Sequence, residues 1–445
     1  MGVLAKLLII IMSIFDALRE MIRDEIEDIK ILFTPDEPGP ATQWILHGHR
    51  NTVGHPTYQK APQYQPVRPQ AQSPAKPAAA SSNTGAANWF NGIGTASASK
   101  QTDSLTVYDL KGNPLHLAAS DCKASGGAGT LYAIPGKPNV LVKIYKEDLL
   151  QNEAKRSEIE KRIYDMLAIS KGIDQSSFAW PRAVVCNSRK QVIGFAMNRC
   201  SGISFEAFSG VKSIQRRFPK WTRRELALIA QDFLIKLQYL TSKKILVNDF
   251  NPANFLVDQK GNVSFIDCDS YQIPGEGTSI HITKTYYASY VAPELLENPK
   301  LLAQPRNIHH VEFGAALTVF YILMCGLHPY SYFDPSKQSA CGTPDENLRK
   351  GRCPLGTGAH CMLPIGNWYN LWSYLTFKLK SSFIQTFRDG HKNPARRATL
   401  ADLQTNLQEL LIIMKKDPVR LDLNPVKAKP KAESSSAGQS FSMDF

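Results

Sequence analysis

The central part of this 445-residue chain is predicted to form an α+β fold. Short strand patterns come first, at 105–117 around a Lys-Gly-Asn-Pro turn and at 140–145, where the sequence is VLVKIY. Long helix patterns follow at 153–169, 222–243 and 310–327. Strands that precede helices, without regular alternation, are typical of α+β proteins rather than of parallel sheets built from βαβ units.

Two of the helix patterns carry further support. The pattern at 222–243 opens with Thr222 and Glu225 at the spacing of a capping box, in which each side chain bonds the backbone amide of the other residue. The third helix pattern is almost wholly apolar, which predicts a helix buried on all sides. Between them, two short strand patterns bound a polar loop that carries Asp249, and the second of these strands ends at Asp267.

The composition limits the class of protein but not its fold. Lys and Arg number 52 against 39 Asp and Glu, so the formal net charge is +13 and contact with phosphates or other anions is favoured. The eight cysteines are scattered, which argues against a secreted scaffold held by disulfides and indicates a reducing compartment. We therefore expect a cytoplasmic protein.

Both ends of the chain differ in composition from its centre. Residues 1–34 are expected to form an amphipathic helix, whose apolar stretch at 7–15 is too short to cross a bilayer. Three interpretations stay open: the helix lies on a membrane or a partner, it packs on its own chain, or Met12 is the true start. Pro, Ala, Gln and Ser dominate 35–104, which predicts a disordered linker, and 417–445 is expected to be a disordered tail.

One set of residues has the chemistry of a phosphate and metal site. A glycine-rich hairpin lets a backbone approach phosphates closely, although such a segment alone indicates only a tight turn. Its glycines are Gly126, Gly127 and Gly129. The strand lysine Lys143 follows and can reach phosphates as a fixed cation. Oxygen ligands of the kind that Mg²⁺ prefers are offered by Asp249, Asn254 and Asp267.

Segments along the chain, taken in order, resemble the motifs of the protein kinase superfamily. They are AxGxxG at 124–129, VLVKIY at 140–145, EKRI at 160–163, GFAMNRCSG at 194–202, VNDFNPAN at 247–254, IDCD at 266–269 and YVAPE at 290–294. The resemblance spans about 105–416 and is greatest to divergent bacterial kinase-like proteins. It implies a bilobal fold, with a small β-rich N-lobe at 105–200, a larger helical C-lobe at 201–416 and Mg-ATP bound between them.

The resemblance also implies which residues contact the nucleotide. Its phosphates would be covered by Gly126, Gly127, Gly129 and Leu131. Beside the gatekeeper Met197, the carbonyl of Asn198 and the amide of Cys200 would contact adenine. Lys143 would bind the α- and β-phosphates, and the helix glutamate Glu160 would hold this lysine in place.

The remaining implied roles concern catalysis and the C-lobe. Asp249 would accept or orient the proton of the substrate hydroxyl, and Asn254 and Asp267 would hold Mg²⁺. Glu294 would form an ion pair with an arginine near Arg397. The fallback partners for the phosphate lysine are Glu158 and Glu153.

Several positions depart from the usual kinase motifs. His-Arg-Asp becomes Val-Asn-Asp at 247–249, which removes the usual arginine partner of a phosphorylated activation segment. A lysine position is occupied by Asn251, and His309 stands where an aspartate is usual. Asp-Phe-Gly becomes Asp-Cys-Asp at 267–269, so that Asp269 is an additional acid and a candidate metal ligand. The base, both metal ligands and the phosphate lysine are retained, which favours an active kinase over a pseudokinase.

The predicted function is therefore phosphoryl transfer from Mg-ATP to a protein hydroxyl, with Ser/Thr favoured. Two alternatives stay open: a pseudokinase scaffold that binds nucleotide or partners without turnover, and a nucleic-acid or membrane adaptor that uses basic patches. We expect a protein substrate and no specific nucleic acid. The N-terminal helix would dock a partner or a membrane surface, which would place the protein at the membrane periphery.

Three further features carry hypotheses. A basic cluster before the helix pattern at 222–243 predicts a solvated face, a dock for acidic substrates or a nucleic-acid patch. It comprises Lys212, Arg216, Arg217, Lys220, Arg223 and Arg224. The ligand types of a zinc site, without its usual spacing, occur at Cys341, Cys353, His360 and Cys361. The segment 270–290 carries hydroxyl residues that are candidate autophosphorylation sites.

Overall fold

The computed structural model describes residues 104–331, 333–334, 339–340, 342–356, 363 and 367–424. The helix predicted at 1–34, nearly all of the linker at 35–104 and most of the tail at 417–445 lie outside these residues. Outside them as well are Cys341, His360 and Cys361, so the zinc site stays a prediction.

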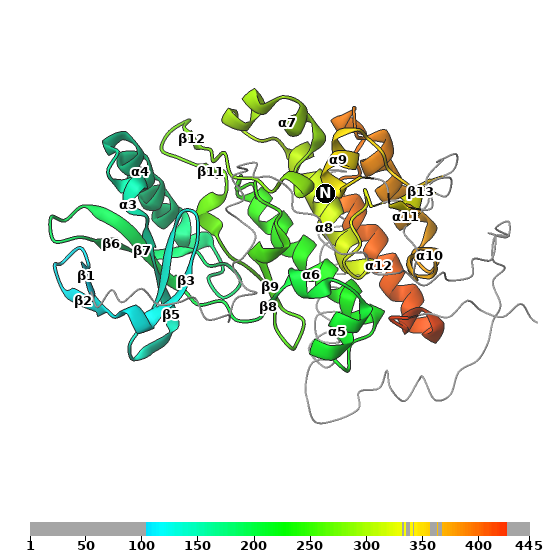
Figure 1. Ribbon diagram of the computed structural model, residues 1–445, viewed down its shortest axis with the longest axis horizontal. Helices are drawn as coiled ribbons and strands as arrows, with labels where there is room; N and C mark the ends of the chain where they lie inside the picture. The colour runs from blue at the N-terminus through cyan, green and yellow to red at the C-terminus, as the bar shows by residue number, and fades with distance from the viewer. Residues whose placement is uncertain are drawn as a thin grey trace, which may run out of the picture. The chain divides into compact units, whose positions relative to one another are not determined.

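A curled antiparallel sheet of seven strands forms the N-terminal lobe (Figure 1). The strands lie in the order β2-β1-β6-β7-β5-β4-β3, so that β5 is held between β7 and β4. The helix α4 packs against β6 and β7. The bounds in this lobe are β1 Leu105–Tyr108, β2 Pro114–Leu117, β3 Cys122–Ser125, β4 Gly129–Ile134, β5 Lys137–Tyr145, α3 Glu147–Leu150, α4 Glu153–Ile169, β6 Pro181–Cys186 and β7 Val192–Asn198.

Helices dominate the C-terminal lobe, where α6, α8 and α12 pack together (Figure 1). Its strands form only small sheets, in the orders β10-β9-β8, β11-β12 and β13-β14. The bounds are β8 Ile203–Ser204, α5 Val211–Arg217, α6 Arg223–Ser242, β9 Phe255–Val257, β10 Val263–Phe265, β11 Ile273–Pro274, β12 Ile280–His281, α7 Pro293–Glu297, α8 Ile308–Leu323, β13 Phe333–Asp334, β14 Ser339–Ala340, α9 Pro344–Arg349, α10 Trp368–Ser373, α11 Phe377–Ile384 and α12 Leu400–Lys416. A strand-rich lobe followed by a helical one confirms the predicted α+β, bilobal kinase-like fold.

The helix α6 begins as its sequence predicts. The backbone amide of Thr222 donates to Oε2 of Glu225 at 2.5 Å, and the Thr222 hydroxyl accepts from the amide of Arg224 at 3.1 Å. Such a capping box satisfies amides that have no partner within the helix. The cap therefore fixes where α6 starts.

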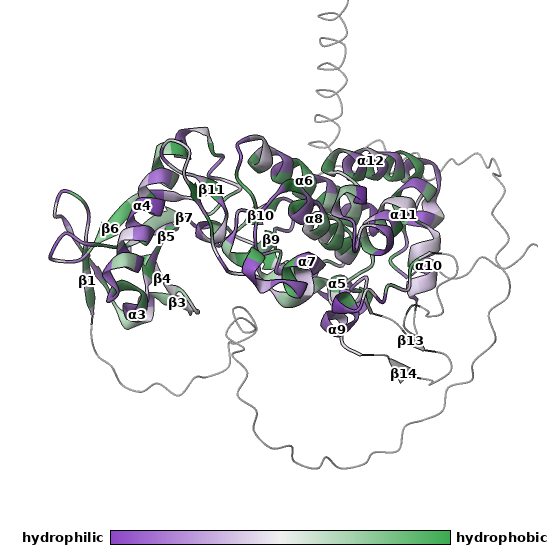
Figure 2. Ribbon diagram, turned by 90° about the horizontal axis from the view of Figure 1, so that it is seen from above, coloured by the Kyte–Doolittle hydropathy of each residue, from purple (hydrophilic) through white to green (hydrophobic). Residues whose placement is uncertain are grey.

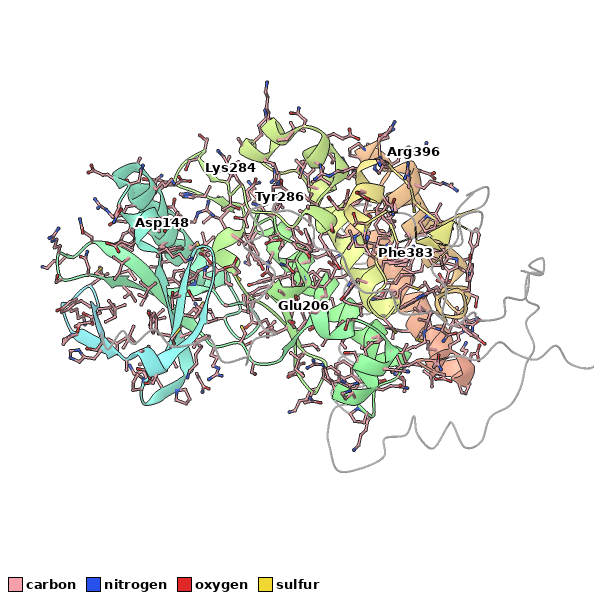
Figure 3. The ribbon with its side chains drawn as sticks, viewed as in Figure 1. Asp148, Glu206, Lys284, Tyr286, Phe383 and Arg396 are labelled. Atoms are coloured by element: carbon pink, nitrogen blue, oxygen red, sulfur yellow. The ribbon has the colours of Figure 1, made fainter. Side chains whose placement is uncertain are left out.

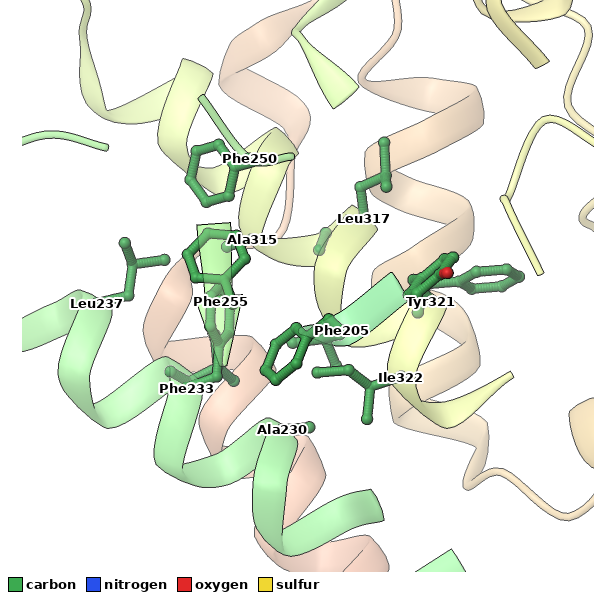
Figure 4. Close-up of a cluster of buried hydrophobic side chains, with 14 of the residues drawn as sticks. Phe205, Ala230, Phe233, Leu237, Phe250, Phe255, Ala315, Leu317, Tyr321 and Ile322 are labelled. Carbon is green, nitrogen blue, oxygen red and sulfur yellow. The ribbon is translucent and has the colours of Figure 1, made fainter. Parts of the chain in front are cut away.

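Aromatic side chains join α6 and α8 to the strands of the C-terminal lobe (Figure 4). The rings of Phe233 on α6 and Phe255 on β9 meet edge to face with their centroids 5.1 Å apart. The ring of Phe250, the residue after Asp249, has its centroid 6.2 Å from that of Phe255. Full burial of one such side chain stabilises the fold by about 1.5–3 kcal/mol. The core therefore holds the backbone on both sides of the polar loop.

The helix α8 is predominantly apolar after its first turns (Figure 2), and its residues from Val311 to Leu323 are all buried. The sequence predicted a helix at 310–327, but α8 begins after its cap Asn307 and ends four residues before the predicted end. The reason is that Cys325 and Gly326 have positive φ angles of 50° and 88°, which no α-helix accommodates. None of the helices in the described part of the chain is both long and apolar enough to cross a membrane.

The described fold also continues past the C-terminal boundary predicted at Lys416. A short 3₁₀ turn covers Pro418–Leu421, and Leu423 is buried in the core of the C-terminal lobe. Arg420 forms an ion pair with Asp417 at 3.0 Å. The ordered domain therefore includes residues that the sequence assigned to the tail, because apolar residues are too sparse there to give a helix or strand pattern.

We predict that Gly314→Ala disturbs the loop that carries Asp249. A Cβ at Gly314 would lie 2.2 Å from Cδ2 of Phe250, so the ring and its backbone must shift. Overpacking of this kind lowers the free energy of unfolding by about 1–3 kcal/mol. Urea unfolding measures the change. The smaller side chain of Phe250→Leu leaves room for the added methyl. The double variant should therefore lose less free energy of unfolding than the sum of the losses in the two single variants.

Candidate active site

The strand β5 places Lys143 in the middle of the N-terminal sheet. Lys143 pairs with Leu131 of β4 on one side and with Phe195 of β7 on the other. The close approach of β7 requires a glycine at position 194, because a Cβ there would lie 2.0 Å from the carbonyl oxygen of Lys143. The lysine side chain is only 4% exposed. Its backbone is therefore fixed from both sides and its amine is directed into the protein.

The amine of Lys143 meets two acids from the C-terminal lobe. Its Nζ lies 2.6 Å from Oδ1 of Asp267, a residue 124 positions later in the chain. It also lies 2.7 and 2.8 Å from the two carboxylate oxygens of Asp269. Burial alone would lower the pKa of Lys143, but the two carboxylates outweigh burial and raise it above its ordinary value. The structure thus brings the predicted phosphate lysine and the predicted metal ligand into contact.

Asp269 is held more tightly than Asp267. The Tyr145 hydroxyl donates to Oδ2 of Asp269 at 2.8 Å, and Tyr145 lies two residues after Lys143 on the same face of β5. Burial would raise the pKa of Asp269, but Lys143 and the Tyr145 hydroxyl lower it below the ordinary value for aspartate. Asp269 is therefore a buried carboxylate. The sequence identified it as an additional acid and a candidate metal ligand, but no local motif indicated its contacts with Lys143 and Tyr145.

The predicted ion pair between Lys143 and Glu160 is wrong for this structure. Among the described residues, the ion pairs of Lys143 are those to Asp267 and Asp269. The charged residue that α4 buries is Arg162, beside Ile163 and Met166. Residues two positions apart on a helix point about 200° away from each other, so Glu160 faces away from Arg162. The fallback partners Glu153 and Glu158 are exposed.

Arg162 binds the backbone that follows Asp267. Its Nη1 donates to the carbonyls of Asp269 and Tyr271 at 3.2 and 2.9 Å, and its Nη2 donates to the carbonyl of Ile282 at 2.9 Å. A second contact joins α4 to the same segment, because Asp165 lies 2.6 Å from Nε2 of His281 on β12. The helix therefore supports the segment after the metal motif through a cation and main-chain carbonyls.

The loop at 247–254 brings Asp249 and Asn254 together. Nδ2 of Asn254 donates to the carbonyl of Asp249 at 3.3 Å, and the amide of Ile266 donates to the carbonyl of Asn254 at 2.9 Å. Asn254 is thus tied both to the predicted base and to the strand that leads into Asp267. Asp249 is 7% exposed, and burial raises its pKa to about 6, with a further contribution from the charge of Asp267.

The glycine segment forms the hairpin between β3 and β4. The amide of Gly126 donates to the carbonyl of Gly129 at 2.9 Å, and Gly127 has open space where a side chain would be. Gly129 is required by close packing, because a Cβ there would lie 2.4 Å from the carbonyl oxygen of Ile144. Leu131 pairs with Lys143, so the hairpin is directly linked to the lysine strand.

The residues predicted to contact adenine lie at the end of β7 and just beyond it. Met197 is 7% exposed and pairs with Leu141 of β5. Asn198 ends the strand, and its side chain donates to the carbonyl of Gln175 at 2.9 Å. Cys200 is partly buried, which raises the pKa of its thiol to about 11. The structure places these residues at the junction of the two lobes, and their contacts with adenine stay a prediction.

The side chains present fit a magnesium ion that is bound together with a nucleotide. Within the described ranges, no cluster of three or more His, Cys, Asp or Glu side chains forms a closed metal cage. Mg²⁺ is usually bound by one or two carboxylates plus substrate phosphates, so an open set of ligands is expected. The side chain of Asp267 is 34% exposed, and Asn254 is tied to the strand before it. Asp267 and Asn254 are therefore the candidate ligands.

The predicted ion pair of Glu294 is confirmed with Arg397. The two guanidinium nitrogens Nη1 and Nη2 lie 2.8 and 2.7 Å from the two carboxylate oxygens, a bidentate arrangement. Nη1 of Arg397 also donates to the carbonyl of His309 at 2.9 Å, and Nε to that of Gly390 at 3.1 Å. Burial would raise the pKa of Glu294, but Arg397 lowers it below its usual range. This pair fixes α7 to the helical part of the C-terminal lobe.

One other sequence hypothesis, the basic cluster, changes when the structure is considered. The basic cluster loses Arg223, whose side chain is buried and donates to the carbonyl of Leu371 at 2.8 Å, because α6 turns this residue toward the core. The Lys212, Arg216, Arg217 and Lys220 side chains are exposed. The thiol of Cys268 is buried, and burial raises its pKa well above the ordinary value, so it is not a reactive thiolate.

A separate hollow of about 320 Å³ lies between the end of α6, the β11–β12 hairpin and the start of α8. It is lined by Thr241, Lys244, Leu246, Gln272, Pro274, Ile280 and Ile308. None of the predicted nucleotide or metal residues lines it. It is therefore not part of the candidate active site.

Comparisons with known proteins agree with the predicted relationship. No family model matches the chain. It is 28% identical over 234 residues to the protein kinase YegI of Escherichia coli O157:H7, an alignment that covers 49% of this chain and 34% of that protein. It is 29% identical over 217 residues to YegI of Escherichia coli strain K12, an alignment that covers 46% of this chain and 31% of that protein. It is 24% identical over 221 residues to the MAP kinase kinase MKK1/SSP32 of Saccharomyces cerevisiae, an alignment that covers 49% of this chain and 39% of that protein. The chain thus spans about a third of the length of these relatives.

We predict that Arg397→Met lowers the free energy of unfolding by about 3 kcal/mol, because it leaves the Glu294 carboxylate without its buried partner. The neighbouring Arg396 is exposed and lies at the periphery of the molecule (Figure 3), so Arg396→Met is the matched control and should change stability by less than about 0.5 kcal/mol. Urea unfolding of both variants measures the difference. Equal effects would contradict a structural role for the pair.

Proposed function

Because this chain is related to the protein kinase superfamily, we propose that it transfers the γ-phosphoryl group of ATP to serine or threonine hydroxyls of a protein substrate. The observation that carries the proposal is the contact of 2.6 Å between Nζ of Lys143 and Oδ1 of Asp267, which come from different lobes. A fixed cation next to a candidate metal ligand is the arrangement that a triphosphate requires.

Each predicted residue has a proposed task in this reaction. Lys143 binds the α- and β-phosphates, while the backbone of the glycine hairpin covers them. Asp267 and Asn254 hold Mg²⁺, which when bound neutralises charge that develops on the phosphates. Asp249 accepts the proton of the substrate hydroxyl. The hydroxyl oxygen of the substrate forms a bond to the γ-phosphorus as the bond between this phosphorus and ADP breaks. Adenine lies beside Met197, bound by the backbone of Asn198 and Cys200.

The hydrogen bonds of Asn248 support the proposal that the activation segment, residues 270–290, is held in place without a phosphorylated residue. Nδ2 of Asn248 donates to Oγ1 of Thr283 at 3.0 Å and lies 3.4 Å from the carbonyl of Ser270, to which the Thr283 hydroxyl also donates. Neutral hydrogen bonds thus join the loop of Asp249 to the activation segment at the position where a kinase usually has an arginine. Phosphorylation of exposed residues in this segment, such as Thr278 and Ser279, stays a separate hypothesis.

The proposed function predicts how four proteins compare in a radiolabelled-ATP assay with MgCl₂ and a mixture of Ser/Thr and Tyr peptides. The wild type should label Ser or Thr peptides. Lys143→Met, Asp267→Ala and Asp249→Asn should each lose at least about 100-fold in rate, because each removes a charge next to the reacting phosphates. A wild type that binds ATP but shows no more labelling than these variants would instead identify a pseudokinase.

The buried position of Asp249 predicts an acid limb in the pH profile. Its pKa is raised to about 6, so the carboxylate takes up a proton and loses its capacity as a base when the pH falls through this value. We expect kcat at saturating Mg-ATP to fall about tenfold per pH unit below about pH 6. An ordinary aspartate would keep its activity to about pH 4. Circular dichroism at pH 5 checks that the fold is intact, and a flat profile down to pH 5 would contradict the role of Asp249.

A further inference from the structure

We infer that Asp269 is the residue that positions Lys143 for the phosphates of ATP. The inference rests on the proposed function and deepens it. An acid from the loop after β10 takes the task that the sequence assigned to a glutamate of α4. Asp269 is a positioning residue, because it acts through Lys143 and not on the nucleotide itself.

The contacts of Asp269 are those of an anchor. Both of its carboxylate oxygens lie within 2.8 Å of Nζ of Lys143, whereas Asp267 contacts this amine through Oδ1. The Tyr145 hydroxyl donates to Oδ2 of Asp269. Three hydrogen bonds from two groups of the strand β5 therefore fix one carboxylate, and a charge-assisted pair of this geometry restricts the amine to one position.

The exposure of the two acids separates their tasks. The side chain of Asp269 is 7% exposed and that of Lys143 is 4% exposed, while that of Asp267 is 34% exposed. A metal ligand has to face the nucleotide, and Asp267 is the more accessible acid. Asp269 has its oxygens occupied by Lys143 and Tyr145, so we assign it to the amine and not to the metal.

The backbone of Asp269 is held from α4. Nη1 of Arg162 donates to the carbonyls of Asp269 and Tyr271, and the Arg162 side chain is itself buried. The helix thus contributes a cation that supports the acid-bearing loop, where the sequence predicted a helix acid that contacts the lysine directly. The sequence predicted an acid on the helix. In the structure the helix instead contributes the cation Arg162, and the acid that contacts Lys143 is Asp269 on the loop.

The test measures the dissociation constant of a fluorescent ATP analogue in MgCl₂, a readout that does not require turnover. Asp269→Asn keeps the shape of the side chain but removes its charge, and it should weaken binding by about 10- to 100-fold, the effect of losing a hydrogen bond between charged groups. Tyr145→Phe should weaken binding less. Glu160→Gln should bind like the wild type, as should Asp148→Asn, which removes a surface charge on α3 (Figure 3).

A double variant separates positioning from a general effect on folding. If Asp269 acts through Lys143, adding Asp269→Asn to Lys143→Met should change affinity little further, so the two effects should not add. Additive losses, or weaker binding by Glu160→Gln while Asp269→Asn binds like the wild type, would overturn the inference and leave the proposed function standing. A wild type that binds no ATP analogue would overturn both.

Discussion

One buried ammonium shared by two carboxylates is the interaction on which the site depends. Removing Lys143, Asp267 and Asp269 from water costs several kcal/mol per charge, and this cost is offset only when the charges meet at close range with their remaining hydrogen bonds satisfied. The amine comes from the sheet of the N-terminal lobe and the acids come from the C-terminal lobe. This cluster therefore joins the two lobes through side chains that are stable in this buried position only when they meet.

The support for this cluster comes from main-chain contacts as much as from side chains. Gly194 lets β7 lie close to the carbonyl of Lys143, and Gly314 lets Phe250 lie against α8 beneath the loop of Asp249. Arg162 binds three carbonyl groups of the segment after the metal motif. Because carbonyls and glycines carry no side-chain chemistry, these supports depend on where the backbone runs, and they fix the positions of the charged side chains at the candidate site.

The sequence was sufficient to identify residues that lie in a recognisable local motif. Lys143 lies in a strand motif and Asp267 follows another strand, so both could be assigned to one site from their motifs, although their direct contact was not predicted. Glu294 and Arg397 could likewise be paired from the motif in which each lies. The α+β order of the elements also followed from patterns, and burial of an apolar helix followed from composition.

The same reasoning failed where direction depends on tertiary packing. A helix such as α4 presents several charged residues, and only its rotation against the sheet decides that Arg162, and not Glu160, faces inward. The acid at position 269 was visible in the sequence, but its partner was not, because Tyr145 and Lys143 reach it from another lobe. The end of α8 was misplaced for a related reason, since the positive φ angle of Cys325 has no signal in the sequence.

An aspartate at position 269 also limits how the loop after β10 can move. The residue usual at this position of a kinase is glycine, which rotates freely, whereas Asp269 is a buried anion bound to Lys143 and Tyr145. Asp267 adopts a left-handed backbone conformation with φ 57° and ψ 37°, and such a residue persists only when its surroundings determine it. Turning this loop would separate the Asp269 carboxylate from the Lys143 amine, and an unpaired charge is strongly unfavourable in a buried site. The contacts of Asp269 with Lys143 and Tyr145 therefore favour a single conformation of this loop, where the glycine of the usual motif would leave it free to turn.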